Sequence, residues 1–199
     1  MPTLYLGFLA SHGGSNMQAI IDACNNGKLD AKPCCVISNN SDSLALQRAI
    51  KEGIPNYHVS SVKYPNPIEL DRAIADRFTE NGVDTIVLAG YMKKLGSSVI
   101  QKFKGRILNI HPALLPKYGG KGMYGNFVHE AVIKAGEKFS GPTVHLVDEF
   151  YDKGRILGQK KVPVLPNDTI ETLSARVLEQ EHLLFPEVLQ KIALGEIVI

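Results

Sequence analysis

Short apolar runs alternate with amphipathic segments along most of the chain. The runs are apolar at consecutive positions, which is typical of strands buried on both faces, and they predict strands at 4–10, 32–39, 56–60, 84–90 and 106–110. Helical spacing of apolar residues predicts helices at 15–27, 43–53, 66–82, 97–105 and 126–136, with Ser15 as the N-cap of the first. This alternation predicts an α/β fold, with a mostly parallel sheet and helices on both faces.

The pattern changes in the last third of the chain. Two apolar segments, 142–148 and 155–165, flank a short turn and predict a C-terminal antiparallel strand pair. A long helix from Thr169 to Leu194 is predicted to follow, with an apolar stripe that includes Leu183. The length suits one domain with a sizeable core, so we expect 1–199 to fold as a single domain.

Composition and charge argue against several classes of protein. The formal net charge is +2 and the basic residues are scattered, so we expect no nucleic acid and no membrane as partner. The N-terminus lacks the basic region of a signal peptide, and no segment approaches the ~20 apolar residues of a membrane helix. Three cysteines without framework spacing indicate reduced thiols, and we expect a cytoplasmic location. The six histidines lack ligand spacing, so no metal is predicted.

Three loops are predicted to share one edge of the sheet. They are SHGGSN after the first strand, GYMKKLG after the fourth, and HPALLPKYGG after the fifth. Ligands of parallel sheets bind beyond the carboxyl ends of the strands, which is the edge where these loops lie.

The glycine loop SHGGSN has the features of an anion site. Glycine lets the backbone adopt positive φ and approach a ligand closely. The N–H groups of Gly14, Ser15 and Asn16 would lie at a helix N-terminus, where the helix dipole favours an anion such as phosphate. The alternative is a tight turn that only caps the helix. The loop matches neither GxGxxG nor the P-loop pattern, so it does not indicate dinucleotide or nucleoside triphosphate binding.

A polar pair, Asn109 and His111, stands where the fifth strand ends. The two residues are at strand spacing and face the same side. Imidazole moves a proton near neutral pH, and an amide N–H can donate to the oxyanion of an acyl transfer. A carboxylate is then expected to favour the imidazolium. The candidates, which no local feature separates, are Asp148, Glu149 and Asp152. The alternative is a histidine that only bonds to backbone at the strand end.

Five segments in a fixed order resemble one enzyme family. They are ASHGGSNMQAI, VLAGYMKKL, NIHPALLPKY, GPTVHLVDEFYDKGRIL and ARVLEQEHLLFP. From Leu4 to Pro186 the chain resembles the glycinamide ribonucleotide (phosphoribosylglycinamide) formyltransferases of purine biosynthesis. The resemblance implies a Rossmann-like formyltransferase fold and transfer of a formyl group from 10-formyltetrahydrofolate, a cosubstrate, to the amine of glycinamide ribonucleotide. It implies no metal.

The resemblance also assigns site residues. Its catalytic residues fall on Asn109, His111 and Asp152, with Asp152 matching the acid of the segment that starts at His145. His145 is a candidate to support these three. The ribonucleotide-binding residues would be Gly14, Ser15, Asn16 and Glu181, and the folate-binding residues would be Met92, Lys93, Lys94, Leu95 and Asn109. The part at about 1–105 would then bind mainly the phosphate of the ribonucleotide, and the part at about 106–199 the folate.

Other functions are also compatible with the sequence, and the chain differs from the family pattern at two places. Relatives of this fold include 10-formyltetrahydrofolate hydrolases, which usually carry an extra N-terminal domain, and methionyl-tRNA formyltransferases, which carry an extra C-terminal one. A non-catalytic phosphosugar- or folate-binding module is a further alternative. The loop Gly119–Asn126 is longer than in better-known members, and Lys93 stands where an Arg is common. We expect small-molecule substrates and either a monomer or a homodimer.

Overall fold

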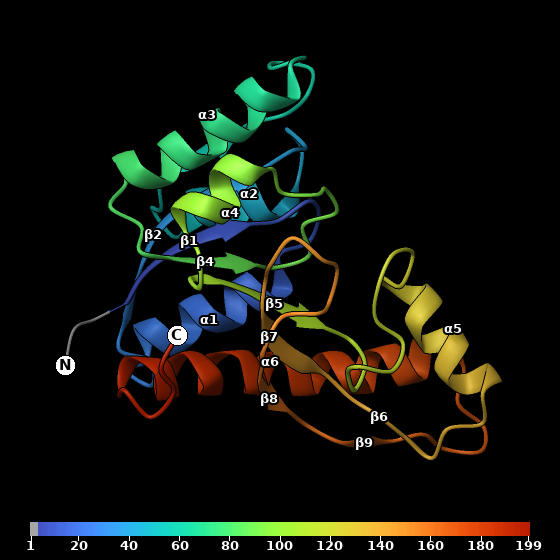
Figure 1. Ribbon diagram of the computed structural model, residues 1–199. Helices are drawn as coiled ribbons and strands as arrows, with labels where there is room; N and C mark the ends of the chain where they lie inside the picture. The colour runs from blue at the N-terminus through green and yellow to red at the C-terminus, as the bar shows by residue number, and fades with distance from the viewer. Residues whose placement is uncertain (1–3) are drawn as a thin grey trace.

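The computed structural model describes residues 4–199. Its elements in chain order are β1 (Leu4–Leu9), α1 (Ser15–Asn25), β2 (Ala31–Ser38), α2 (Leu44–Lys51), β3 (Asn56–His58), α3 (Pro67–Glu80), β4 (Thr85–Leu88), α4 (Ser97–Lys102), β5 (Ile107–His111), α5 (Asn126–Lys134), β6 (Phe139–Ser140), β7 (Thr143–Leu146), β8 (Ile156–Gln159), β9 (Val162–Pro163) and α6 (Ile170–Ala193). Figure 1 shows a central sheet between helical layers, with the long α6 running beneath it.

The main sheet has seven strands in the order β3-β2-β1-β4-β5-β7-β8. The strands from β3 to β5 are parallel, whereas β7 is antiparallel to β5 and β8 is antiparallel to β7. The predicted mostly parallel sheet, the antiparallel C-terminal strands and the long last helix are therefore confirmed. The chain moves outward from β1 to β3 and returns to β4 on the other side of β1. Loops after β1 and β4 thus diverge at a topological switch point, the usual position of a ligand in such sheets.

Helices cover both faces of the sheet because its strands are apolar on both sides. Phe8 of β1 packs in the core beneath α1, α2 and α6, whereas Leu9 packs in the core beneath α3 and α4. Gly7 faces the second core, where an added Cβ would lie 2.5 Å from the ring of Phe78. A larger residue there would push α3 away from the sheet, so this position requires glycine.

Three details of the sequence prediction are wrong. Helix α1 is preceded by Gly14 as N-cap, with no side-chain cap, and Ser15 is the first helical residue. The predicted strand 155–165 is broken into β8 and β9, and β9 pairs with β6 in a separate two-stranded sheet. Between β8 and β9, Lys160 donates its N–H to the carbonyl of Pro142. Leu183 of α6 is 56% exposed, so it lies outside the buried stripe of that helix.

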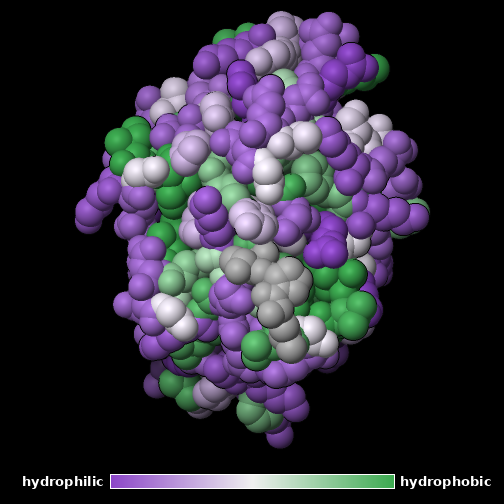
Figure 2. Space-filling model, turned by 90° about the vertical axis from the view of Figure 1, so that its left-hand side faces the viewer, coloured by the Kyte–Doolittle hydropathy of each residue, from purple (hydrophilic) through white to green (hydrophobic). Residues whose placement is uncertain are grey.

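Figure 2 views the molecule from the left-hand side of Figure 1, the side on which α6 ends. Hydrophilic residues predominate there, and the hydrophobic ones form separate groups between them. No helix among residues 4–199 is both long and apolar enough to span a membrane.

Candidate active site

The loops at the carboxyl edge of the sheet are tied together by Ser11. Its N–H donates to the carbonyl of Gly90 at 3.0 Å, which joins the loop after β1 to the loop after β4. Its hydroxyl oxygen accepts from the N–H of Met92 at 2.8 Å. The buried carboxylate of Asp71 accepts from the N–H groups of Gly96 (2.9 Å) and Ser98 (2.6 Å), at the start of α4. These bonds fix both ends of the loop that carries the predicted folate-binding residues.

Asn109 and His145 meet across the antiparallel pair β5 and β7. They are register partners, and Nδ2 of Asn109 lies 3.2 Å from Nε2 of His145. Nδ1 of His145 donates to the carbonyl of Leu146 at 2.8 Å, so in the neutral ring Nε2 accepts from Asn109, whereas in the protonated ring Nε2 donates to Asp152. One N–H of the Asn109 amide is thereby used in the hydrogen bond to His145, and the second N–H of the same nitrogen can donate to another acceptor.

His111 and Asp152 form the second half of the site. Nδ1 of His111 lies 3.6 Å from Oδ2 of Asp152, and Nε2 of His111 lies 2.7 Å from the carbonyl oxygen of Tyr118. His145 also faces Asp152, with 3.5 Å between Nε2 and Oδ1. Both ring nitrogens of His111 thus face acceptors, which is the arrangement that favours the doubly protonated imidazolium.

Of the three candidate acids, the structure brings Asp152 to His111. Asp152 has a φ of 55°, a left-handed conformation that Asp tolerates better than most residues. Its Oδ2 also accepts from the N–H of Gly120 at 2.9 Å. Asp148 is exposed and accepts from the N–H of Phe150 within its own turn. The left-handed conformation at Asp152 therefore explains why this acid contacts His111 and Asp148 does not.

The pKa values of the pair move in the same direction from opposite causes. Burial lowers the pKa of His111 below its usual value, although Asp152 and the Tyr118 carbonyl oppose this. Burial alone would raise the pKa of Asp152, but the contact with His145, the Gly120 N–H and the nearby His111 together lower it. Asp152 is therefore a carboxylate across the neutral range, and its charge is what supports protonation of His111.

A cavity of about 110 Å³ opens beside these residues. Asn109, His145 and Asp152 line it, whereas His111 lies behind them and is only 3% exposed. The remaining wall comes from the loop after β4 and from the turn after β7, namely Leu88, Tyr91, Lys93, Lys94, Leu95, Ile100, Val147, Asp148, Glu149, Phe150 and Tyr151. Of the predicted folate-binding residues, Leu95 is buried and Met92 is exposed outside this wall.

The glycine loop places its predicted residues at the start of α1. Gly14 has a φ of 65°, and an added Cβ there would lie 2.9 Å from Cβ of Ala45. Asn16 is buried and donates through Nδ2 to Oε2 of Glu181 at 2.7 Å. Burial raises the pKa of Glu181 to about 7, and the Asn16 bond offsets part of this rise. Oδ1 of Asn16 is buried without a partner among residues 4–199, which marks a position for a donor.

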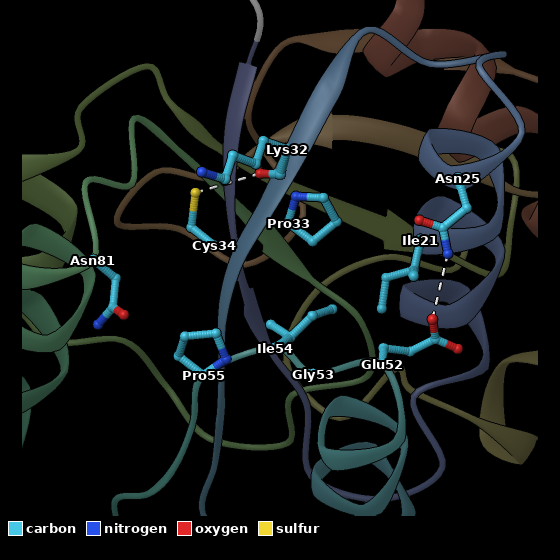
Figure 3. Close-up of a pocket in the computed structure, with 10 residues that line it drawn as sticks. All are labelled: Ile21, Asn25, Lys32, Pro33, Cys34, Glu52, Gly53, Ile54, Pro55 and Asn81. Carbon is cyan, nitrogen blue, oxygen red and sulfur yellow. Dashed lines mark hydrogen bonds between the residues drawn. The ribbon is translucent and has the colours of Figure 1, made fainter.

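A larger cavity of about 480 Å³ lies elsewhere, beside the first half of β2. Figure 3 shows Cys34 and Asn81 on one side of this strand, and Ile21, Asn25 and Glu52 on the other. The cavity contains none of the residues of the His111–Asp152 site, and its carboxylate, Glu52, already accepts from Asn25 and Gln18. We therefore place the candidate active site at the smaller cavity, where the polar groups converge.

Some features of the site are absent from the sequence prediction. The Tyr118 carbonyl contacts His111 and the Gly120 N–H contacts Asp152, and a backbone group carries no residue-type signal. The two glycines that follow Tyr118 are the one available indication of a close approach there. Tyr151 also lines the cavity, with Nζ of Lys94 5.8 Å from its ring centroid. In the described part of the chain, no group of His, Cys, Asp and Glu is arranged to hold a metal ion.

Comparisons with known proteins agree on one family. A family model described as formyl transferase matches residues 6–189. The chain is 46% identical over 182 residues to the phosphoribosylglycinamide formyltransferase of Haemophilus influenzae, covering 92% of this chain and 84% of that protein. It is 44% identical over 194 residues to the chloroplastic phosphoribosylglycinamide formyltransferase of Vigna unguiculata, covering 97% of this chain and 62% of that protein. The crystal structure of glycinamide ribonucleotide transformylase 1 from Symbiobacterium toebii matches with a TM-score of 0.93 and 38% identity, covering 99% of this chain and 91% of that one.

Proposed function

The chain belongs to the formyl transferase family, and we propose that it is an enzyme that transfers the formyl group of 10-formyltetrahydrofolate to the amine of glycinamide ribonucleotide, in purine biosynthesis. The observation that carries this proposal is the convergence of Asn109, His145 and Asp152 on one cavity, with His111 directly behind. An amide donor, an imidazole and a carboxylate are the groups that formyl transfer to an amine requires.

Asn109 is the group that stabilises the developing oxyanion. The substrate amine attacks the formyl carbon, and the carbonyl oxygen becomes negatively charged as the carbon becomes tetrahedral. Nδ2 of Asn109 has one proton held by His145, so the second proton is pre-oriented for that oxygen. A donor held in place before the reaction needs little reorganisation, which is why it lowers the barrier.

His111 and Asp152 handle the proton that the reaction must move. The attacking amine loses one proton, and the departing folate nitrogen gains one. Tyr118 and Asp152 face the two ring nitrogens of His111, so we assign His111 to proton transfer together with Asp152, which lines the cavity, and not by direct contact with substrate. Asp152 lies between His111 and the cavity, and its carboxylate stabilises the imidazolium.

The start of α1 suits the ribonucleotide. The N–H groups of Gly14, Ser15 and Asn16 are at a helix N-terminus, which favours the phosphate. The unpartnered Oδ1 of Asn16 and the carboxyl of Glu181 beside it suit the donor groups of the ribose or of the amine. No Cβ at residue 14 blocks a close approach, since that residue is glycine.

The cavity beside Asn109 suits the ring end of the folate. Its volume of about 110 Å³ is below the ~300 Å³ of a pocket that encloses a whole ligand, so the rest of the folate would lie over the surface. Lys93, Lys94 and Met92 are exposed next to it and would contact that outer part. Residues from both 1–105 and 106–199 contribute to each substrate site in this assignment.

A formyl-transfer assay tests the proposal. Purified protein is mixed with 10-formyltetrahydrofolate, with and without glycinamide ribonucleotide, and both loss of the formyl-folate and formylation of the amine are followed. We expect turnover that depends on the ribonucleotide and falls at least about 100-fold in His111→Ala. Release of formate without the ribonucleotide would instead assign a hydrolase, and undiminished transfer by His111→Ala would refute the mechanism.

A further inference from the structure

The backbone of Tyr118 reaches the active site from the loop that follows β5. Its carbonyl oxygen lies 2.7 Å from Nε2 of His111, a shorter contact than the 3.6 Å between Nδ1 of His111 and Asp152. His111 is 3% exposed, so water cannot replace this acceptor freely. The orientation of the imidazole ring therefore depends on the position of one peptide group.

That peptide group is held in an unusual conformation. Tyr118 has a φ of 56°, and Tyr118 and Asp152 are the non-glycine residues with positive φ among residues 4–199. A bulky side chain disfavours the left-handed region, so the surrounding contacts must stabilise it. Both residues with this conformation contact His111, one at each ring nitrogen.

The side chain of Tyr118 supplies the contact that holds its backbone. Its hydroxyl donates to Oε1 of Glu137 at 2.9 Å, just beyond the end of α5. Nζ of Lys117 lies 2.8 Å from the same oxygen. Tyr118 is thus bonded at both ends: the carbonyl to His111 and the hydroxyl to Glu137 on the outside of the loop.

We propose that Tyr118 is a positioning residue that fixes the orientation and protonation of His111 through its carbonyl, and that the hydroxyl bond to Glu137 holds Tyr118 in place. This inference rests on the proposed function only where it predicts a change in the rate of formyl transfer. The protonation of His111 can be measured without substrate. Tyr118 acts through His111 and does not contact the reacting atoms.

The direction of the effect follows from the charges around His111. The titratable groups that act on it are Asp152 from the turn after β7, His145 from β7 and His129 from α5. Of these, Asp152 raises the pKa of His111 and His145 lowers it, while the Tyr118 carbonyl raises it by accepting from the protonated ring. Loosening Tyr118 leaves the three side chains in place and removes one stabilising contact, so the pKa of His111 falls.

Two variants break the same bond from opposite sides. Tyr118→Phe removes the donor hydroxyl, and Glu137→Ala removes the acceptor. Lys117→Met is the matched control, because it removes the neighbouring contact to Glu137 and keeps the Tyr118 hydroxyl bond. The titration of the His111 ring is followed by NMR in the free protein, and kcat for formyl transfer is followed against pH in parallel. Thermal unfolding checks that each variant is folded.

We expect the His111 titration to move to lower pH in Tyr118→Phe and Glu137→Ala, by less than about one pH unit, with kcat about three- to tenfold lower. Lys117→Met should leave both unchanged. An unshifted titration in Tyr118→Phe would overturn the proposal, even if the rate fell, because the residue would then be only structural. A shift in Lys117→Met as large as that in Glu137→Ala, but toward higher pH, would also overturn it, because surface charge would then be the cause. If no variant and no wild-type protein transfers formyl, the proposed function fails, while the NMR titration still decides this inference.

Discussion

Asn109 and His145 face each other across β5 and β7, with 3.2 Å between the amide nitrogen and Nε2 of the imidazole. Two strands that run in opposite directions thus bring the proposed oxyanion donor into direct contact with the imidazole that orients it. The orientation of the ring is determined because the carbonyl of Leu146 accepts a hydrogen bond from Nδ1 of His145. A pre-oriented amide is the feature of this site from which the first prediction follows.

Asn109→Ala is expected to lower kcat for formyl transfer by ~100- to 1000-fold, because an oxyanion donor is lost. The KM values for both substrates should change far less than kcat. Asn56→Ala is the control, since Asn56 has the same residue type on β3 of the same sheet and its side chain donates to the carbonyl of Ile54. A reduction of less than about threefold in Asn109→Ala would show that another group stabilises the oxyanion.

Asp152→Asn is expected to lower kcat about 100-fold or more, because the imidazolium of His111 loses its carboxylate. Asp152 raises the pKa of His111, so its loss should move the His111 titration to lower pH. Ring proton shifts measured by NMR against pH would report this directly. Asp148→Asn is the comparison, since Asp148 lines the same cavity without facing His111. Equal losses of activity in both variants would mean that general negative charge, and not the His111 contact, is required.

Glu181→Gln is expected to change stability in a pH-dependent way. The pKa of Glu181 is raised from 4.5 to about 7 by burial, so the folded state keeps a proton that the unfolded state releases between these values. Stability of the wild type therefore falls as pH rises through this window, and the variant does not share the fall. Relative to wild type, the variant should gain on the order of 2 kcal/mol in free energy of unfolding by pH 7.

Urea unfolding at several pH values between 4.5 and 7 measures this difference. Glu179→Gln, at an exposed position on the same helix, should show no such trend. A constant difference between Glu181→Gln and wild type across the window would contradict the raised pKa. We also expect weaker binding of the ribonucleotide by Glu181→Gln, because a site residue that costs stability is commonly retained for function.

Gly14→Ala is expected to destabilise the protein by about 2–3 kcal/mol, because a Cβ at this position meets Ala45 at 2.9 Å in addition to the left-handed φ of 65°. Gly27→Ala isolates the second effect: its φ is 67° and nothing lies within 4 Å of the added Cβ. That control should cost only about 1 kcal/mol. Chemical denaturation of both variants measures the difference, and equal losses would show that the contact with Ala45 relaxes without cost.

Part of this fold was accessible from residue pattern alone. Consecutive apolar residues gave β1, β2, β4 and β5, and helical spacing gave the helices that cover them, because burial on both faces leaves a signature in the local sequence. Strand geometry then placed Asn109 and His111 on one side at the carboxyl edge. The pairing of β9 with β6 was missed, because a two-residue strand has no pattern of its own.

The sequence by itself determined which chemical groups are present and that they gather at one edge of a parallel sheet, since period and chain direction are local properties. Only the tertiary structure decided which groups touch. Asp152, and not Asp148, contacts His111 because the left-handed conformation at Asp152 directs its side chain there. His145 contacts Asn109 because the register of β5 and β7 makes them partners. Every residue type has a backbone carbonyl, so the residue type at position 118 could not predict the contact with His111. That contact depends on the path of the loop after β5. Contacts between distant segments are set by register and loop geometry, and local sequence encodes neither.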